Sequence, residues 1–96
     1  MRPSEILAKH IDEVRETIAR FPVENPRLFG SVARGEDLEG SDIDILVDAS
    51  ETATYYDLAR LELALEDLLG VNVDIGTANA LRPSIAESVL LEARPI

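Results

Sequence analysis

The chain has 96 residues and a formal net charge of −10, from 19 acidic residues against 9 basic ones. This acidic balance argues against sequence-independent binding to a nucleic-acid backbone, which needs lysine and arginine. No cysteine is present, which excludes disulfides and thiolate metal sites, and no apolar run approaches the roughly 18 residues that cross a membrane. We therefore expect one globular domain over residues 1–96, in the cytoplasm and without a membrane anchor.

The first half of the chain predicts a helix and two strands. Ser4 can cap a helix that ends before Phe21. After turn-forming proline and asparagine residues, residues 27–30 form a short strand, and residues 32–40 form a loop. Residues 42–48 form the second strand. The apolar residues of the helix recur at helical spacing and are Leu7, Ile11, Val14 and Ile18.

The second half predicts a helix over residues 54–69, which Gly70 stops, and a third strand over residues 71–76. A last helix is expected over residues 84–93. The run Val89-Leu90-Leu91 in this helix has more apolar surface than one helix face needs. Core packing and a partner surface both explain it.

Alternation along the strands predicts where their carboxylates lie. In residues 42–48, isoleucine and valine alternate with aspartate, and in residues 71–76 apolar residues alternate with Asn72 and Asp74. If the apolar faces lie on the helices, Asp74 emerges on the face that holds Asp42 and Asp44. The helix between these strands allows a parallel crossover, and the short link from the first strand favours an antiparallel neighbour. The predicted fold class is α+β, a mixed three-stranded sheet with helices on one face.

A glycine-flanked hydroxyl precedes two alternate aspartates. Gly30-Ser31 stands eleven residues upstream of Asp42-Ile43-Asp44. Side chains two apart on a strand project from one face, roughly 6 to 7 Å apart, and can share cations such as Mg²⁺. A glycine turn lets the backbone approach a polyphosphate, and its amides and the serine hydroxyl can donate hydrogen bonds to phosphate oxygens. The pattern indicates a phosphate and metal site.

These residues resemble the nucleotidyltransferase superfamily that includes DNA polymerase β and kanamycin nucleotidyltransferase. The run Gly-Ser-Val-Ala-Arg-Gly, then Ser-Asp-Ile-Asp-Ile-Leu-Val and the later Val-Asp-Ile around Asp74, is most similar to the minimal nucleotidyltransferases encoded beside HEPN-type ribonuclease toxins. The resemblance implies that Gly30 and Ser31 hold the triphosphate of ATP or another nucleotide. It also implies that Asp42 and Asp44 bind two Mg²⁺ ions, with Mn²⁺ as an alternative, and that Asp74 is the third metal-binding and catalytic carboxylate.

The resemblance implies an antitoxin that transfers AMP from ATP to a hydroxyl of a HEPN-type toxin. Two alternatives stay open: a non-catalytic module that neutralises its partner by binding, and a nucleotidyltransferase that modifies a small molecule such as an aminoglycoside. The chain lacks an extra domain for a small-molecule pocket, so the last ranks lowest.

Four further side chains need an interpretation. Arg34 is a candidate nucleotide ligand, although an ion pair with Glu36, Asp37 or another loop carboxylate explains it equally well. His10 lies at the edge of the first helix's apolar stripe and is left out of the site. Tyr55 and Tyr56 are expected to be partly buried and are also left out.

Overall fold

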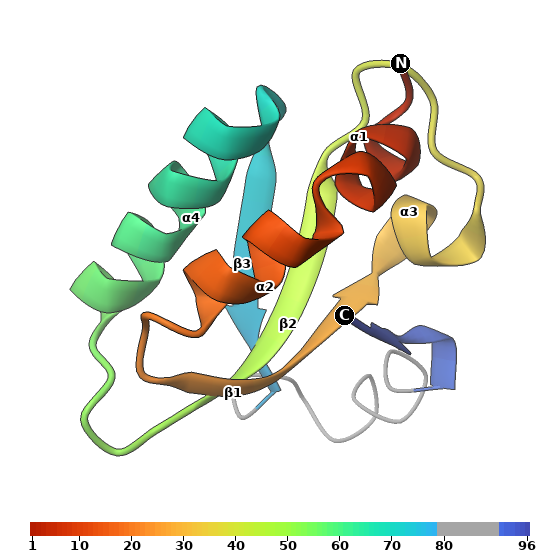
Figure 1. Cartoon of the computed structure of the whole chain (residues 1–96). Coiled ribbons are helices and arrows are strands. Elements are labelled where there is room, and N and C mark those ends of the chain that lie inside the picture. The colour runs from red at the N-terminus through yellow and green to blue at the C-terminus, as the bar shows by residue number, and fades with distance from the viewer. Residues whose placement is uncertain (79–90) are drawn as a thin grey trace.

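The structure is a computed structural model and describes residues 1–78 and 91–96 (Figure 1). One sheet holds its strands in the order β3-β2-β1-β4. Helices α1, α2 and α4 lie together on one face of this sheet (Figure 1). The elements in chain order are α1 (Pro3–Lys9), α2 (Ile11–Ile18), β1 (Val23–Phe29), α3 (Gly30–Arg34), β2 (Ile43–Ala49), α4 (Tyr55–Leu69), β3 (Val73–Thr77) and β4 (Arg94–Pro95).

The sheet is mixed, as predicted. Strand β1 pairs antiparallel with β2, and β2 pairs parallel with β3 across the α4 crossover. The predicted number of three strands is wrong, because β4 pairs antiparallel with the outer edge of β1, Arg94 opposite Leu28. A two-residue strand is too short to show any periodicity in the sequence. The expected helix over residues 84–93 falls mostly outside the described residues.

The core lies between the sheet and the three helices. The apolar face of β2 is fully buried, and the apolar residues of β3 continue it. Helix α4 buries one stripe against this face, and α1 and α2 add a few residues each. The buried residues of the cluster are Leu7, Val14, Ile18, Val32, Ile43, Ile45, Val47, Leu61, Leu65, Leu69, Val73 and Ile75.

The N-terminal helix is interrupted, which the sequence did not predict. His10 has φ −115° and ψ 22°, outside the helical region, so α1 ends and α2 begins there. The expected cap at Ser4 is also wrong, since the helix starts at Pro3 with Arg2 as its N-cap. Proline is favourable at the first helical position because its missing N–H would have no partner there. The interruption leaves the spacing of the buried residues intact.

Strand β1 starts four residues earlier than the predicted strand over residues 27–30. The strand runs through Pro26, a residue whose type favours a turn. The register shifts between Glu24 and Arg27, and Asn25 has a positive φ of 51°. Proline has no N–H for a ladder and is tolerated in sheets at bulges of this kind. The carbonyl of Pro26 still accepts a hydrogen bond of 3.1 Å from the Ile96 N–H.

Helix α4 matches the prediction closely. Thr54 is its N-cap and forms a capping box with Asp57, and Gly70 closes it with a left-handed φ of 71°. The expected partial burial of its first two rings is wrong: Tyr55 is 91% and Tyr56 70% exposed. Both stand on the outer side of the helix start, where Arg60 lies over the Tyr56 ring.

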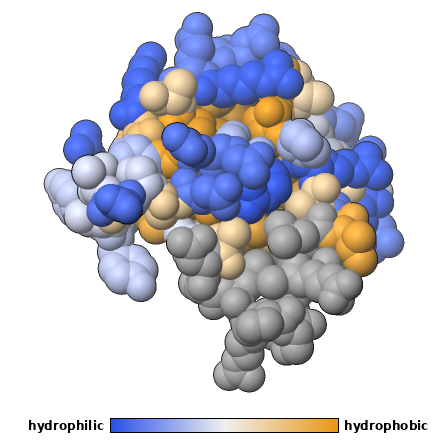
Figure 2. Space-filling view, turned by 90° about the horizontal axis from the view of Figure 1, so that it is seen from below, coloured by the Kyte–Doolittle hydropathy of each residue, from blue (hydrophilic) through white to orange (hydrophobic). Residues whose placement is uncertain are grey.

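The surface is mostly hydrophilic. Figure 2 shows hydrophilic residues over much of the face seen from below, with apolar residues visible between them. Leu91 is 82% exposed, whereas Val89 and Leu90, named with it in the sequence analysis, lie outside the described residues. Within residues 1–78 and 91–96, no helix is long and apolar enough to cross a membrane.

Candidate active site

The register between β2 and β3 sets two aspartates side by side. Asp44 is the partner of Asp74 in this parallel pair, with isoleucine and valine pairs before and after it. Since those apolar neighbours are buried toward the helices, both carboxylates emerge on the opposite face. Asp44 is half-buried and Asp74 is exposed. Asp42 precedes β2, is exposed, and by alternation belongs to the same face.

This face is not polar throughout. Leu46 follows Asp44 in the alternation and is only 1% exposed. Its Cδ1 lies 3.6 Å from the position that a Cβ on Gly76 would take. Farther along β2, Asp48 is paired with the buried Arg27, whose Nη2 donates to its Oδ1 at 3.2 Å. That hydrogen bond lowers the pKa of Asp48. Asp48 therefore has a cationic partner of its own, and we do not count it with Asp42, Asp44 and Asp74.

Gly30 connects β1 to the carboxylates. Phe29, the last residue of β1, is paired with Asp44, so Gly30 follows beside the Asp44 side chain. A Cβ on Gly30 would lie 2.5 Å from Oδ2 of Asp44, and the φ of Gly30 is +72°. Both facts require glycine, because real Cβ atoms do not come this close and other residues rarely adopt this φ. Gly30 and Ser31, predicted to form a turn, begin the short helix α3, and the loop predicted over residues 32–40 is wrong for residues 32–34, which belong to the same helix.

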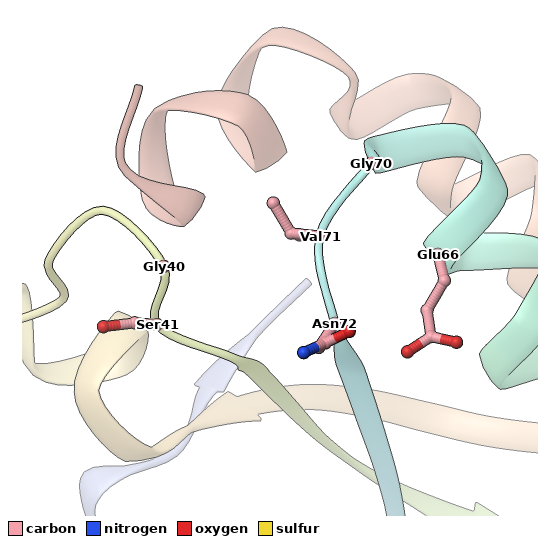
Figure 3. A pocket seen from close by; sticks show the side chains of 6 residues that line it. All are labelled: Gly40, Ser41, Glu66, Gly70, Val71 and Asn72. Atoms are coloured by element: carbon pink, nitrogen blue, oxygen red, sulfur yellow. The ribbon is translucent and has the colours of Figure 1, made fainter.

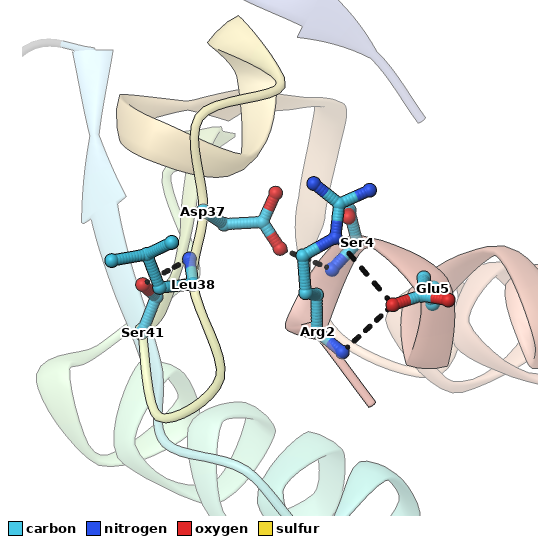
Figure 4. Close-up of polar contacts among 6 residues, drawn as sticks. All are labelled: Arg2, Ser4, Glu5, Asp37, Leu38 and Ser41. Atoms are coloured by element: carbon cyan, nitrogen blue, oxygen red, sulfur yellow. Dashed lines mark hydrogen bonds and ion pairs between the residues drawn. The ribbon is translucent and has the colours of Figure 1, made fainter.

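The loop before Asp42 is fixed at two points (Figure 4). Asp37 is 1% exposed, and its Oδ2 accepts a hydrogen bond of 2.8 Å from the Ser4 N–H. Ser41 accepts a hydrogen bond of 2.9 Å from the Leu38 N–H through its Oγ. Burial raises the pKa of Asp37, but the hydrogen bonds from Ser4 outweigh it and the pKa is lowered. Asp37 therefore ties the site loop to α1 and does not pair with Arg34.

The negative charges of Asp42, Asp44 and Asp74 repel one another. Burial raises the pKa of Asp44, and the negative charges of Asp74 and Asp42 raise it further, while the charge of Arg34 opposes them. Within the described part of the chain, no three carboxylate or histidine side chains are already close enough to ligate one ion. The donors are nevertheless the oxygen ligands that Mg²⁺ prefers, and a cation between them would relieve their repulsion. By the chemistry of their oxygens Asp42, Asp44 and Asp74 suit a divalent ion, and their side chains would have to draw closer together to ligate one.

Arg34, the last residue of α3, is held by two carboxylates. Its Nε lies 3.2 Å from Oε2 of Glu36, and its Nη1 lies 3.3 Å from Oε2 of Glu92. The ion-pair interpretation of Arg34 is thus confirmed for Glu36. Glu92 stands 58 positions away in the chain, so no spacing pattern could have indicated it.

A hollow of about 370 Å³ opens where β2 and β3 begin. Figure 3 shows it between the turn at Gly40-Ser41 and the segment from Gly70 to Asn72, with Val71 directed into it. The carbonyl of Asn72 accepts a hydrogen bond of 2.9 Å from the Ile43 N–H, so this hollow adjoins Asp42. Its lining comes from two turns and from Glu66 of α4, which lie far apart in the sequence, so no spacing pattern indicated it.

This fold, and carboxylates on two neighbouring strands beside a glycine, define a nucleotidyltransferase. The chain belongs to the nucleotidyltransferase domain family, whose model matches residues 7–96. It is 45% identical over 87 residues to the protein adenylyltransferase MntA of Thermococcus cleftensis, covering 91% of this chain and 85% of that protein.

Two solved structures show the same fold. The first, assigned as a minimal nucleotidyltransferase, has a TM-score of 0.87 and 48% identity, over 97% of this chain and 95% of the other. The second, a toxin–antitoxin structure with AMP-PNP, has a TM-score of 0.71 and 26% identity, over 92% of this chain and 69% of the other. The resemblance stated from the motif, the α+β fold class and the assignment as a nucleotidyltransferase are confirmed.

Proposed function

We propose that the chain transfers AMP from ATP to a hydroxyl group of a partner protein and is the antitoxin of a HEPN-type toxin. The observation that carries the proposal is the Asp44–Asp74 pair, with Asp42 on the same face and Gly30 against the Asp44 carboxylate. These residues are the candidate catalytic centre of the nucleotidyl transfer that defines the family.

We propose that Asp42, Asp44 and Asp74 hold two Mg²⁺ ions, or Mn²⁺ in their place. When bound, such ions stabilise negative charge on the transferred and leaving phosphates. The half-buried Asp44 between two like charges supports this assignment, because its repulsion is relieved by cations. Gly30 and Ser31 begin α3 beside this group and are proposed to bind the triphosphate, with Arg34 neutralising part of its charge.

In the proposed reaction the acceptor hydroxyl oxygen forms a bond to the α-phosphorus of ATP. The bond from this phosphorus to the bridging oxygen of the β-phosphate breaks, and pyrophosphate leaves. The hydroxyl proton passes to the carboxylate of Asp74, which is exposed and therefore accessible to an acceptor from outside. The products are an AMP ester of the partner and free pyrophosphate.

The choice of a protein acceptor rests on the relatives. The T. cleftensis relative is a protein adenylyltransferase, and the AMP-PNP neighbour is a toxin–antitoxin structure. The net charge of −10 fits a free metal-bound nucleotide better than a nucleic-acid polymer. The lack of cysteine fits action in the cytoplasm, which is part of this proposal.

Intact-mass measurement of the partner tests the proposal. The product of the adjacent gene, as the proposed partner, is incubated with ATP, Mg²⁺ and either the wild-type protein or Asp44→Asn, with Asp67→Asn as control. Asp67 is an exposed carboxylate of α4, on the helical side of the sheet. The wild type and Asp67→Asn should add AMP to the toxin, and Asp44→Asn should not. Neutralisation of an unmodified toxin would favour the non-catalytic binding alternative.

A further inference from the structure

The ion pair between Arg34 and Glu92 joins the candidate nucleotide site to the C-terminal segment. Arg34 lies three and four positions after Ser31 and Gly30 on α3, so these residues share one helix face. Side chains on a helix lean toward its N-terminus, which directs Arg34 back over that face.

Glu92 is held in place from its own side. Two residues later the chain enters β4, where Arg94 pairs with Leu28 and Pro95 with Arg27. The Ile96 N–H then donates to the Pro26 carbonyl at 3.1 Å. Figure 1 shows this segment beside β1 and below α3. The pairing of β4 with β1 therefore anchors the chain two residues after Glu92, whose own backbone is helical.

Two carboxylates leave part of the Arg34 guanidinium available. Glu36 accepts from Nε and Glu92 from Nη1. A guanidinium has five N–H groups in a rigid plane, so fixing two of them orients the others. The side chain of Arg34 is 41% exposed, which leaves it accessible to a ligand.

We propose that Glu92 is a positioning residue of the nucleotide site, which orients the Arg34 guanidinium for contact with the triphosphate of ATP. The inference rests on the proposed function, since it assumes that Arg34 faces ATP phosphates. It adds that the C-terminal segment contributes to nucleotide affinity through a residue that itself repels the nucleotide.

The negative charge of Glu92 and its proposed positioning role predict opposite effects of Glu92→Gln on ATP affinity. Removal of a negative charge near a triphosphate should by itself strengthen ATP binding. If Glu92 acts through Arg34, Glu92→Gln should instead weaken it, by about two- to fivefold, the range expected for one partly exposed ion pair. The turnover number at saturating ATP should stay within about twofold, because positioning for binding and not the transfer step is disturbed.

The experiment titrates a fluorescent ATP analogue with Mg²⁺ into the purified protein and needs no partner. Glu51→Gln, which removes an exposed negative charge before α4, is the matched control and should bind as the wild type does. In an Arg34→Ala background, Glu92→Gln should cause no further loss of affinity.

Two results would overturn the inference: ATP affinity that is unchanged or stronger in Glu92→Gln, or an equal loss of affinity in the Arg34→Ala background. A failure of the proposed AMP transfer gives a different result. A wild-type protein that binds ATP but modifies no partner contradicts the proposed transfer and leaves the Glu92 result interpretable. A wild-type protein that binds no ATP contradicts both.

Discussion

Gly30 and the carboxylate of Asp44 occupy adjoining space, so that a Cβ on residue 30 would stand 2.5 Å from Oδ2 of Asp44. The glycine follows β1 as the first residue of α3, and the aspartate lies in β2, so their contact joins the start of α3 to the side chain of Asp44. The backbone at Gly30 therefore limits where the carboxylate of Asp44 can lie.

Gly30→Ala should abolish most of the transfer activity. Alanine at a φ of +72° costs about 1–2 kcal/mol of folding free energy, and its Cβ must displace the Asp44 carboxylate. We expect at least a tenfold loss of turnover, measured as AMP transferred per minute. The matched control is Gly70→Ala, which has φ +71° but no neighbour within 4 Å of its Cβ. In urea unfolding this control should lose similar stability, and its activity should remain.

Equal activity losses in the two glycine variants would contradict the role given to the Gly30–Asp44 contact. They would show that strain in the backbone, and not displacement of the carboxylate, is what lowers the activity.

Divalent ions should stabilise the folded protein by binding to Asp42, Asp44 and Asp74. A ligand that binds only the folded state adds RT ln(1 + [L]/Kd), about 1.4 kcal/mol at roughly ten times Kd. Mn²⁺ should therefore raise the melting temperature of the wild type and of Asp67→Asn, but not that of Asp44→Asn. Removing the ion with EDTA should reverse the shift. A wild-type melting temperature that does not respond to millimolar Mn²⁺ would count against convergence of Asp42, Asp44 and Asp74.

The raised pKa of Asp44 also predicts a pH dependence without metal. Its folded pKa lies above its unfolded value, so the folded state binds the proton more tightly. The contribution of Asp44 to stability is therefore present below about pH 4 and is lost as pH rises through the folded pKa. Asp44→Asn should remove this loss and be more stable than the wild type at pH 7 in EDTA. A less stable Asp44→Asn variant under those conditions would argue against repulsion at this site.

Asp37 should behave in the opposite way. Its pKa is lowered in the folded state, so its contribution is present above about pH 4 and is lost as pH falls through the folded pKa. Asp37→Ala should cost about 1–3 kcal/mol at pH 7, because it leaves the Ser4 N–H without its acceptor. Denaturant unfolding at pH 7 and at about pH 3 should show this difference shrinking with acid. A difference independent of pH would mean that Asp37 acts through packing alone.

Elements with a strong local signal could be predicted from the sequence. The helix predicted over residues 54–69 and its stop at Gly70 agree with α4, which runs from Tyr55 to Leu69 with Thr54 as its N-cap, because both signals depend on neighbouring residues. The parallel pairing of β2 and β3, and with it the common face of Asp44 and Asp74, follows from alternation and the crossover helix.

Features that depend on distant contacts could not be predicted. The bulge that lets β1 pass through Pro26 depends on pairing with β2. The burial of Asp37 depends on an N–H that lies 33 positions away, and the pairing of Arg34 with Glu92 spans 58 positions. The closeness of Gly30 to Asp44 arises only when two strands adopt one register. The sequence thus named the residues of the candidate site but not the contacts that hold them.

The most direct test of the central claim follows two radiolabels through one reaction. The wild-type protein is incubated with Mg²⁺, the proposed HEPN-type partner and ATP labelled at either the α- or the γ-phosphate. The α-label should become bound to the partner, the γ-label should leave as pyrophosphate, and Asp44→Asn should transfer neither. Transfer of the γ-label, or equal transfer of the α-label by Asp44→Asn, would contradict AMP transfer at the Asp44 site.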